Sequence, residues 1–177
     1  MRSRFLPEGR LLHTPENEAA CASRDGLRRA MEEGTVLEGV AQLCDGAHNL
    51  LVSVGPFTGF LPREEAALGI AEGTTREIAI LSRVGKPVCF QITALEESEG
   101  VLRPRLSRRR AQQAALDAML AGLHPGCILP AVVTHLESFG AFVDIGCGVP
   151  SLIGIESISV SRIPHPDQRF RVGQAIF

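Results

Sequence analysis

Short hydrophobic runs that alternate with polar residues dominate the chain between residues 34 and 106. Alternation with a period of two is typical of β-strands, which we expect over 36–40, 50–54, 57–61, 86–95 and 101–106. Turn-forming residues separate the runs, with Asp45-Gly46 after the first and the polar segment 96–100 before the last. Five short strands, with a helical turn after the third, predict a small Greek-key barrel.

Two further segments carry the signals of helices. Residues 14–31 begin with a capping threonine, followed by Pro15 and by acidic residues that suit a first turn. Asp25-Gly26 weakens the middle of this helix, and its apolar residues are small and scattered, so we expect an accessory helix lying on the barrel. Ser107 caps a second helix over 107–123, which ends at His124-Pro125-Gly126.

The pattern of the barrel begins again after this second helix. Four blocks recur in the same order, with 126–132 matching 34–40, 143–146 matching 52–55, 151–154 matching 59–62 and 173–177 matching 85–89. Such a repeat indicates two copies of one fold. The sequence ends where the fourth strand of the second copy begins. Because an unclosed barrel leaves strand edges unpaired, we expect the chain to be a fragment or its carboxyl end to pair elsewhere.

Two phenylalanines, Phe139 and Phe142, stand on either side of Gly140 in the second copy. A strand that starts at Gly140 places Val143 on one face and Phe142 with Asp144 on the other. A buried face accounts for the valine but not for a phenylalanine beside an aspartate. Gly140 lets the backbone turn sharply, so both rings can meet on the outer surface as a platform for unpaired bases. The alternative is that both rings belong to the core.

The run 125–134, the turn Phe139-Gly140-Ala141-Phe142-Val143-Asp144-Ile145-Gly146 and the run 148–153 resemble the RNA-binding module of the ribosomal protein S-one family. The resemblance covers residues 124–177 well and 33–111 more loosely. It implies a five-stranded OB barrel whose Phe-Gly-x-Phe-Val turn stacks bases on Phe139 and Phe142. By the same resemblance, the barrel core comprises Val132, Val143, Ile145, Leu152 and Ile153.

The expected fold class is mainly β with accessory helices, built as tandem five-stranded OB-type Greek-key barrels of which the second is truncated. We divide the chain into an accessory helical region (1–33), a first barrel (34–106), a connecting helix (107–123) and a second barrel (124–177). In the first barrel, His48-Asn49-Leu50-Leu51 replaces the aromatic pair. That barrel therefore has a degenerate RNA-binding face, with Phe57 or Phe60 as weak substitutes, and a spacer or docking role is the alternative.

The second copy departs from the family at Gly154, where the family commonly has a histidine that contacts nucleic acid. His165 and Arg162, further along the chain, are candidates to replace that contact. Cationic side chains also cluster where the first barrel meets the connecting helix, at Arg103, Arg105, Arg108, Arg109 and Arg110. These arginines either hold phosphates between the barrels or form a solvated face. Their place at a helix amino end is electrostatically unfavourable, which indicates that another group offsets the repulsion.

Net charge, apolar runs and cysteine content exclude several classes of protein. A net charge of −2 argues against a nonspecific coat for nucleic acid, although a local basic groove remains compatible with it. No apolar run approaches the roughly 20 residues that span a bilayer, and the amino terminus lacks a signal-peptide core. The 5 cysteines are dispersed and odd in number, as expected of reduced thiols in a cytoplasmic protein that does not bind membranes.

Catalytic and metal sites find little support. His124, Cys127 and His135 do not supply four metal ligands at a recognised spacing. Cys44 beside His48 is better explained as an apolar cysteine in a turn than as a nucleophile with its base. We therefore expect no catalysis, no metal and no cofactor.

The sequence predicts a cytoplasmic protein that binds single-stranded RNA, such as mRNA, in translation, with the small ribosomal subunit as a further partner. Stacking on Phe139 and Phe142 and arginine contacts to phosphate would supply the binding. Two alternatives stay open: an RNA-binding or docking segment of a larger enzyme, and a protein-docking module on the ribosome.

Overall fold

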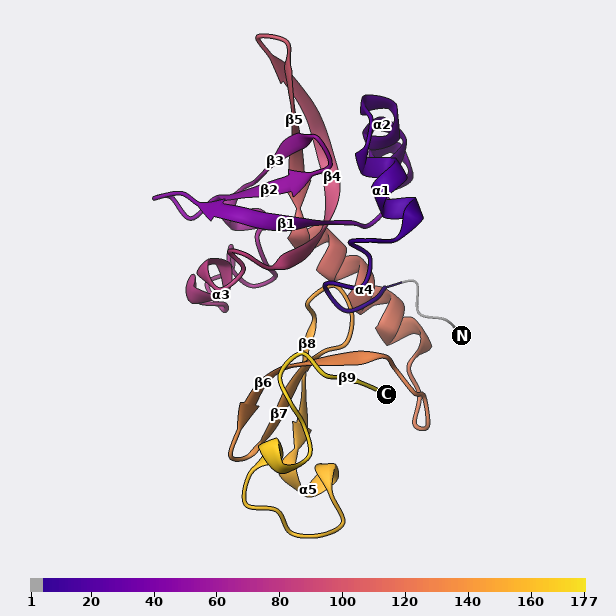
Figure 1. Cartoon of the computed structure of the whole chain (residues 1–177), viewed down its shortest axis with the longest axis vertical. Helices are drawn as coiled ribbons and strands as arrows, with labels where there is room; N and C mark the ends of the chain where they lie inside the picture. Colours follow the sequence, from indigo (N-terminus) through magenta and orange to yellow (C-terminus); the bar gives the residue numbers. More distant parts are fainter. Residues whose placement is uncertain (1–4) are drawn as a thin grey trace.

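Five strands close into a barrel in the first part of the molecule (Figure 1). The computed structural model describes residues 5–177. In chain order the strands are β1 (Leu37–Cys44), β2 (Leu50–Val54), β3 (Phe57–Leu61), β4 (Pro87–Ser98) and β5 (Val101–Ser107), and around the barrel they run β1-β2-β3-β5-β4. One parallel pairing, Phe60 opposite Arg105, closes the ring between β3 and β5. We call residues 37–107 the first module.

The interior of the first module is filled by fully buried aliphatic and aromatic side chains, among them Leu50, Val52, Leu61, Phe90 and Leu106. Along β2 and β3 the buried positions alternate with half-buried ones, as the period-two pattern predicts. A 3-10 turn, η1 (Arg63–Glu65), and a short helix, α3 (Ile78–Leu81), connect β3 to β4.

Four strands form a separate, open sheet in the last part of the chain. They are β6 (Ala131–Glu137), β7 (Gly140–Asp144), β8 (Pro150–Gly154) and β9 (Ala175–Ile176), in the spatial order β8-β7-β6-β9. The helix α5 (Ile155–Ile158) and the 3-10 turn η2 (Pro166–Gln168) lie between β8 and β9. We call residues 131–176 the second module.

The open sheet repeats the topology of the closed barrel with one strand fewer. β9 pairs with β6 as β4 pairs with β1, and β8 follows β7 as β3 follows β2. The two edges of the open sheet, β8 and β9, are thus the equivalents of the strands that β5 joins in the first module. The predicted fold class, a five-stranded OB-type barrel followed by an incomplete second one, is confirmed.

The amino-terminal region holds two helices where the sequence predicted one. α1 (Pro15–Cys21) and α2 (Arg24–Glu33) are separated at Ser23, whose Oγ accepts a hydrogen bond from the Gly26 N–H at 3.1 Å and so starts a new helix. Gly26 is required there, because a Cβ at this position would lie 2.5 Å from the Ala20 carbonyl oxygen. The prediction of a single helix over 14–31 was wrong, since Ser23 competes as a cap.

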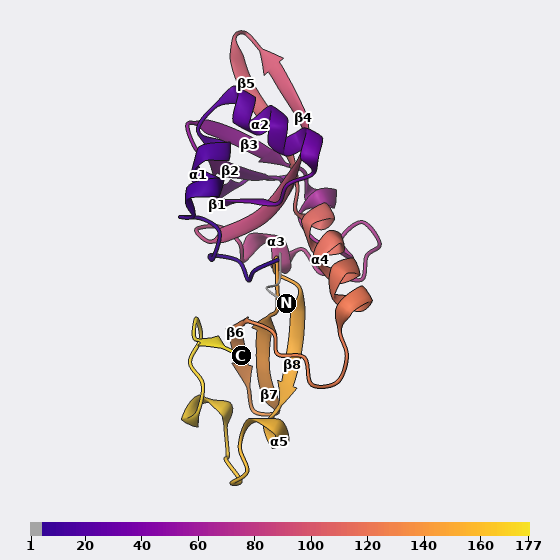
Figure 2. The same cartoon turned by 90° about the vertical axis from the view of Figure 1, so that its right-hand side faces the viewer.

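A long helix, α4 (Arg108–Gly122), connects the two modules and is the predicted connecting helix (Figure 2). Ser107 caps it as expected, accepting a hydrogen bond from the Arg110 N–H at 2.9 Å. Its small residues Ala111 and Ala115 pack in one cluster with Cys89 of the first module and Cys147, which lies between β7 and β8. The helix therefore contributes to a shared core between the modules. Within residues 5–177, no helix has the length and hydrophobicity required to cross a membrane.

Candidate nucleic-acid interface

The outer face of the second module carries a row of side chains across three strands. In the strand register, His135 of β6 lies opposite Phe142 of β7, and Phe142 lies opposite Leu152 of β8. Directly paired residues point to the same side of a sheet. The His135 side chain is 62% exposed and Leu152 is 49% exposed, whereas Phe142 between them is half-buried. We call His135, Phe142 and Leu152 the outer row.

A two-residue turn sets this register. Glu137 pairs with Gly140, so Ser138 and Phe139 are the only residues in the loop of the β6–β7 hairpin. The chain turns sharply directly before Gly140, and Gly140 itself does not take a left-handed conformation. It is required because a Cβ there would lie 2.4 Å from the Ile153 carbonyl oxygen of β8. The glycine thus lets β7 and β8 approach closely directly beside the exposed ring of Phe139.

The two phenylalanines touch on the surface, as the sequence predicted. Their ring centroids are 6.1 Å apart and their planes are nearly perpendicular, at 86°. Phe139, at the turn, is 53% exposed. The His135 ring lies 6.2 Å from that of Phe142 and is tilted by only 32°. A base stacked on this surface would meet the face of one ring and the edge of another.

Aliphatic residues on the opposite face of the sheet form the core of the second module. Val133 and Val143 are almost fully buried there, with Ile153 packed against them. Two members of the predicted core lie elsewhere: Leu152 is exposed in the outer row, and Val132 is only half-buried, opposite Asp144. A register shift between Val133 and His135 accounts for the difference at β6, because one extra residue in the strand changes which side chains face inward.

The five arginines that the sequence grouped together are divided among different environments. Arg103 and Arg110 are exposed, and Arg105 lies 6.0 Å from the centre of the Phe60 ring and forms an ion pair with Glu96. Arg109 forms an ion pair with Glu72. Arg108 is buried, and its guanidinium is bound to a carboxylate inside the protein. We therefore no longer count it among the predicted phosphate contacts.

The partner of Arg108 is Glu8, in the segment that precedes α1. The Arg108 Nε and Nη2 atoms donate to the two Glu8 carboxylate oxygens at 2.6 and 2.9 Å, and the Arg83 Nη1 donates to the same carboxylate at 3.2 Å. Burial disfavours the charged form of Glu8, but the Arg108 guanidinium outweighs it and lowers the pKa of Glu8. Glu8 and Glu72 therefore supply the offset to the arginines at the start of α4 that the sequence indicated.

Glu8 also reaches the second module. Its backbone N–H donates to the Asp144 carboxylate at 2.7 Å, and the N–H groups of Gly146 and Gly148 donate to the same carboxylate at 2.8 and 3.0 Å. Burial, together with the Glu8 carboxylate, raises the pKa of Asp144 to about 6, although these three donors favour the charged form. Nearby, the Gln112 side chain of α4 donates to the Gly148 carbonyl at 3.0 Å.

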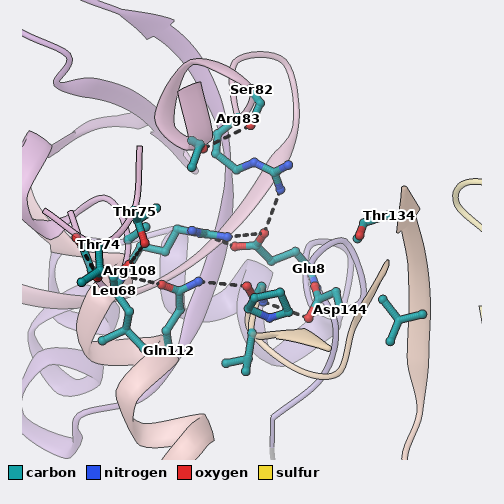
Figure 3. Close-up of a pocket in the computed structure, with 17 residues that line it drawn as sticks. Glu8, Leu68, Thr74, Thr75, Ser82, Arg83, Arg108, Gln112, Thr134 and Asp144 are labelled. Atoms are coloured by element: carbon teal, nitrogen blue, oxygen red, sulfur yellow. Dashed lines mark hydrogen bonds and ion pairs between the residues drawn. The ribbon is translucent and has the colours of Figure 1, made fainter. Parts of the chain in front are cut away.

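A cleft of about 490 Å³ lies between the modules at this junction (Figure 3). One wall comes from residues between 67 and 83 of the first module, with Arg83 at its upper side in Figure 3. The other wall includes Thr134 and Asp144 of the second module. Glu8 and Arg108 also line the cleft, and Figure 3 shows their ion pair between the two walls. Among residues 5–177, no group of three or more His, Cys, Asp or Glu side chains is arranged to hold a metal ion.

Comparison with known proteins identifies the second module. Residues 123–176 match the family model described as "S1 RNA binding domain". The second module is an S1 RNA-binding domain. The family match does not include residues 33–111, where the resemblance in sequence is looser.

The curated relatives are ribosomal proteins. The chain is 28% identical over 156 residues to small ribosomal subunit protein bS1 of Neisseria meningitidis, covering 85% of this chain and 26% of that protein. It is 28% identical over 176 residues to bS1 of Mycobacterium tuberculosis, covering 96% and 34%. The chain thus spans about a quarter to a third of the length of these relatives. The solution structure of GSP13 from Bacillus subtilis aligns at 19% identity with a TM-score of 0.33, over 54% of this chain and 62% of that one.

The structure brings together only part of the predicted site. Phe139 and Phe142 lie in contact on the S1 domain, whereas His165 caps η2, where its Nδ1 accepts a hydrogen bond from the Asp167 N–H, and Arg162 is exposed in the preceding loop. Sequence reasoning missed His135 as a neighbour of the rings. Counting back from the two-residue turn would have placed it opposite Phe142.

Proposed function

We propose that the S1 domain of this chain binds single-stranded RNA by stacking bases on Phe139 and Phe142. The observation that carries the proposal is the pair of rings in contact on the outer face, one of them 53% exposed, beside the exposed His135 and Leu152. Exposed aromatic rings on a small β-sheet are costly in water unless a ligand covers them, and every base offers a π-face that fits.

Cationic side chains in both parts of the chain complete the proposal. Arg162 and His165 of the S1 domain, with Arg103, Arg105 and Arg109 of the first module and the start of α4, are the proposed phosphate contacts. Arg105 and Arg109 are partly exposed even though each holds a carboxylate. Each phosphate neutralised on a single strand steepens the salt dependence of log Kd by roughly 0.7.

Affinity for a fluorescent oligouridine of about ten nucleotides tests the stacking mechanism. Phe142→Ala should weaken binding by about 1–3 kcal/mol, which is roughly 5-fold to 150-fold in Kd. Leu51→Ala is the matched control, because Leu51 occupies the equivalent strand position in the first module, and its Kd should stay within about twofold. Equal affinity of wild type and Phe142→Ala would discard the mechanism. A melting curve for each variant verifies that the fold is kept.

We also propose that the RNA is mRNA and that the chain acts in translation with the small ribosomal subunit. The relationship to bS1 over most of the chain supports this partner. Sedimentation of the labelled protein with purified small ribosomal subunits tests the proposal, and subunits stripped of bound mRNA separate the two partners. Sedimentation that nuclease treatment does not alter would favour protein docking over RNA binding.

A further inference from the structure

We propose that the cleft between the modules holds a phosphate of the same RNA strand, with Arg83 as the cation that binds it. This inference rests on the proposed function, because it extends the path of an RNA already stacked on the S1 domain. It also gives the first module a part in RNA binding that does not depend on its degenerate barrel face.

The cleft continues the stacking surface. Phe142 and Asp144 are two residues apart on β7, so they share one face of the sheet at a spacing of about 7 Å. Asp144 lines the cleft, as do Pro150, which pairs with it on β8, and Thr134. The Thr134 hydroxyl donates to the Phe142 carbonyl at 3.2 Å. An RNA strand that leaves Phe142 along β7 therefore enters the cleft within one or two nucleotides.

Among residues 5–177, the two arginines that line the cleft make different contacts. Arg108 forms the bidentate, buried pair with Glu8, and its side chain is only 6% exposed. Arg83 makes a single, longer contact with the same carboxylate, 3.2 Å, and its side chain is 22% exposed. A guanidinium has five N–H donors in a planar fork suited to phosphate. Figure 3 shows the Arg83 side chain extending from its loop toward the Glu8 carboxylate in the cleft.

The acidic groups of the cleft do not oppose a phosphate strongly. Arg83 and Arg108 balance the charges of Glu8 and Asp144 in the cleft, and Arg108 is held by its bidentate pair with Glu8, so Arg83 is the more available cation. Asp144 is buried, at 5% exposed, and its carboxylate accepts hydrogen bonds from three backbone N–H groups. Its lone pairs are thus turned toward the backbone. The local balance favours an anion beside Arg83 over a cation or a neutral ligand.

RNA length separates the cleft from the stacking surface. A uridine dinucleotide, with about one base for each ring, covers the rings alone, whereas an oligouridine of about ten nucleotides also reaches the cleft. Arg83→Gln should weaken binding of the longer RNA by about threefold to tenfold and lower its salt slope by about 0.7, with no change for the shorter RNA. Arg76→Gln is the matched control, because Arg76 is exposed in the same region of the first module and does not line the cleft.

Two further variants keep the test independent of the Arg83–Glu8 ion pair. Arg83→Lys keeps the charge and should retain most of the salt slope. Ser82→Glu places a carboxylate at an exposed position of the cleft and should weaken binding of the longer RNA only. If the longer RNA binds Arg83→Gln and Ser82→Glu as it binds wild type, the inference is overturned. If Phe142→Ala leaves both RNA lengths unaffected, the stacking proposal fails instead.

Discussion

The two modules place side chains at the same outer positions but fill them with different chemistry. The internal repeat aligns His135, Phe142 and Leu152 of the S1 domain with Leu43, Leu51 and Phe60 of the first module. The strand register agrees, because Leu43 pairs with Leu51 and Leu51 with Phe60. Both modules therefore carry an outer row, and a register shift lies at the same point of the first strand in each.

The turn beside the row shows the difference most clearly. In the S1 domain, Phe139 is exposed and contacts Phe142. In the first module the equivalent residue is His48, which has a φ of 63° and whose Nδ1 lies 2.8 Å from a carboxylate oxygen of Glu77. Glu77 also holds Arg63. The turn of the first module is thus held by the contact of His48 with Glu77, which is itself paired with Arg63.

The aromatic ring of the first row is also covered. Arg105 lies 6.0 Å from the centre of the Phe60 ring, as expected of a cation–π contact. One fold therefore supports an outer row whose phenylalanine contacts two other rings and another whose phenylalanine lies beside an arginine. The backbone determines the position of the outer row, and the side chains determine whether a ligand can contact it.

The largest expected contrast concerns the cores. Leu61 of the closed barrel is fully buried, and its equivalent in the open sheet, Ile153, is only half-buried. Leu61→Ala should lower the free energy of unfolding by about 2–5 kcal/mol, since it leaves a cavity that strands on all sides prevent from collapsing. Ile153→Ala should cost about half as much. Urea denaturation followed by circular dichroism measures both, and a larger loss for Ile153→Ala would contradict the contrast.

The second contrast concerns pH. Asp144 is matched by Ser53 in the first module, which does not titrate. In the folded S1 domain the pKa of Asp144 is about 6, above its ordinary value of 3.8. The folded state therefore holds this proton more tightly than the unfolded state. Protonation of Asp144 therefore adds to the free energy of unfolding. This contribution is full below about pH 4, declines between about pH 4 and pH 6, and is lost above that.

The size of this pH effect is about 2–3 kcal/mol, since each unit of pKa corresponds to about 1.4 kcal/mol. Subtracting the unfolding free energy of Asp144→Asn from that of wild type removes the titration of other groups, including the neighbours Glu8, Arg83 and Arg108. The difference should decline as the pH rises through this window. Ser53→Ala, as the control, should show no such trend, and a flat difference for Asp144→Asn would refute the assignment.

Sequence reasoning succeeded where a local signal determines the structure. The period-two runs predicted the strands, Ser107 predicted the start of α4, and the Phe-Gly-x-Phe turn predicted that the two rings meet at the surface. It failed where distant segments meet. Nothing in the local pattern shows that Glu8 pairs with Arg108, 100 residues away, or that Asp144 accepts the Glu8 N–H. The cleft depends on those contacts, so it appears only in three dimensions.

The smallest expected effect comes from giving the first module a ring that it lacks. Leu51→Phe places a phenyl group at the centre of its outer row, between Leu43 and Phe60. In a Phe142→Ala background, the variant should regain about 1 kcal/mol of affinity for single-stranded RNA, roughly fivefold in Kd. The gain should be smaller than the loss at Phe142, because Arg105 covers the neighbouring ring and His48 stays fastened to Glu77.

Leu51→Ile in the same background is the control for Leu51→Phe, since it changes shape without adding a π-face, and it should bind RNA no better than Phe142→Ala alone. If Leu51→Phe does not increase the affinity for RNA, a ring in the outer row is not sufficient for binding. The turn beside the row must then also be free of the contact between His48 and Glu77. Adding His48→Phe then decides the matter: it removes the ion pair to Glu77 and restores a ring at the position of Phe139. A gain that needs both changes would locate the difference between the modules in the turn and not in the strand.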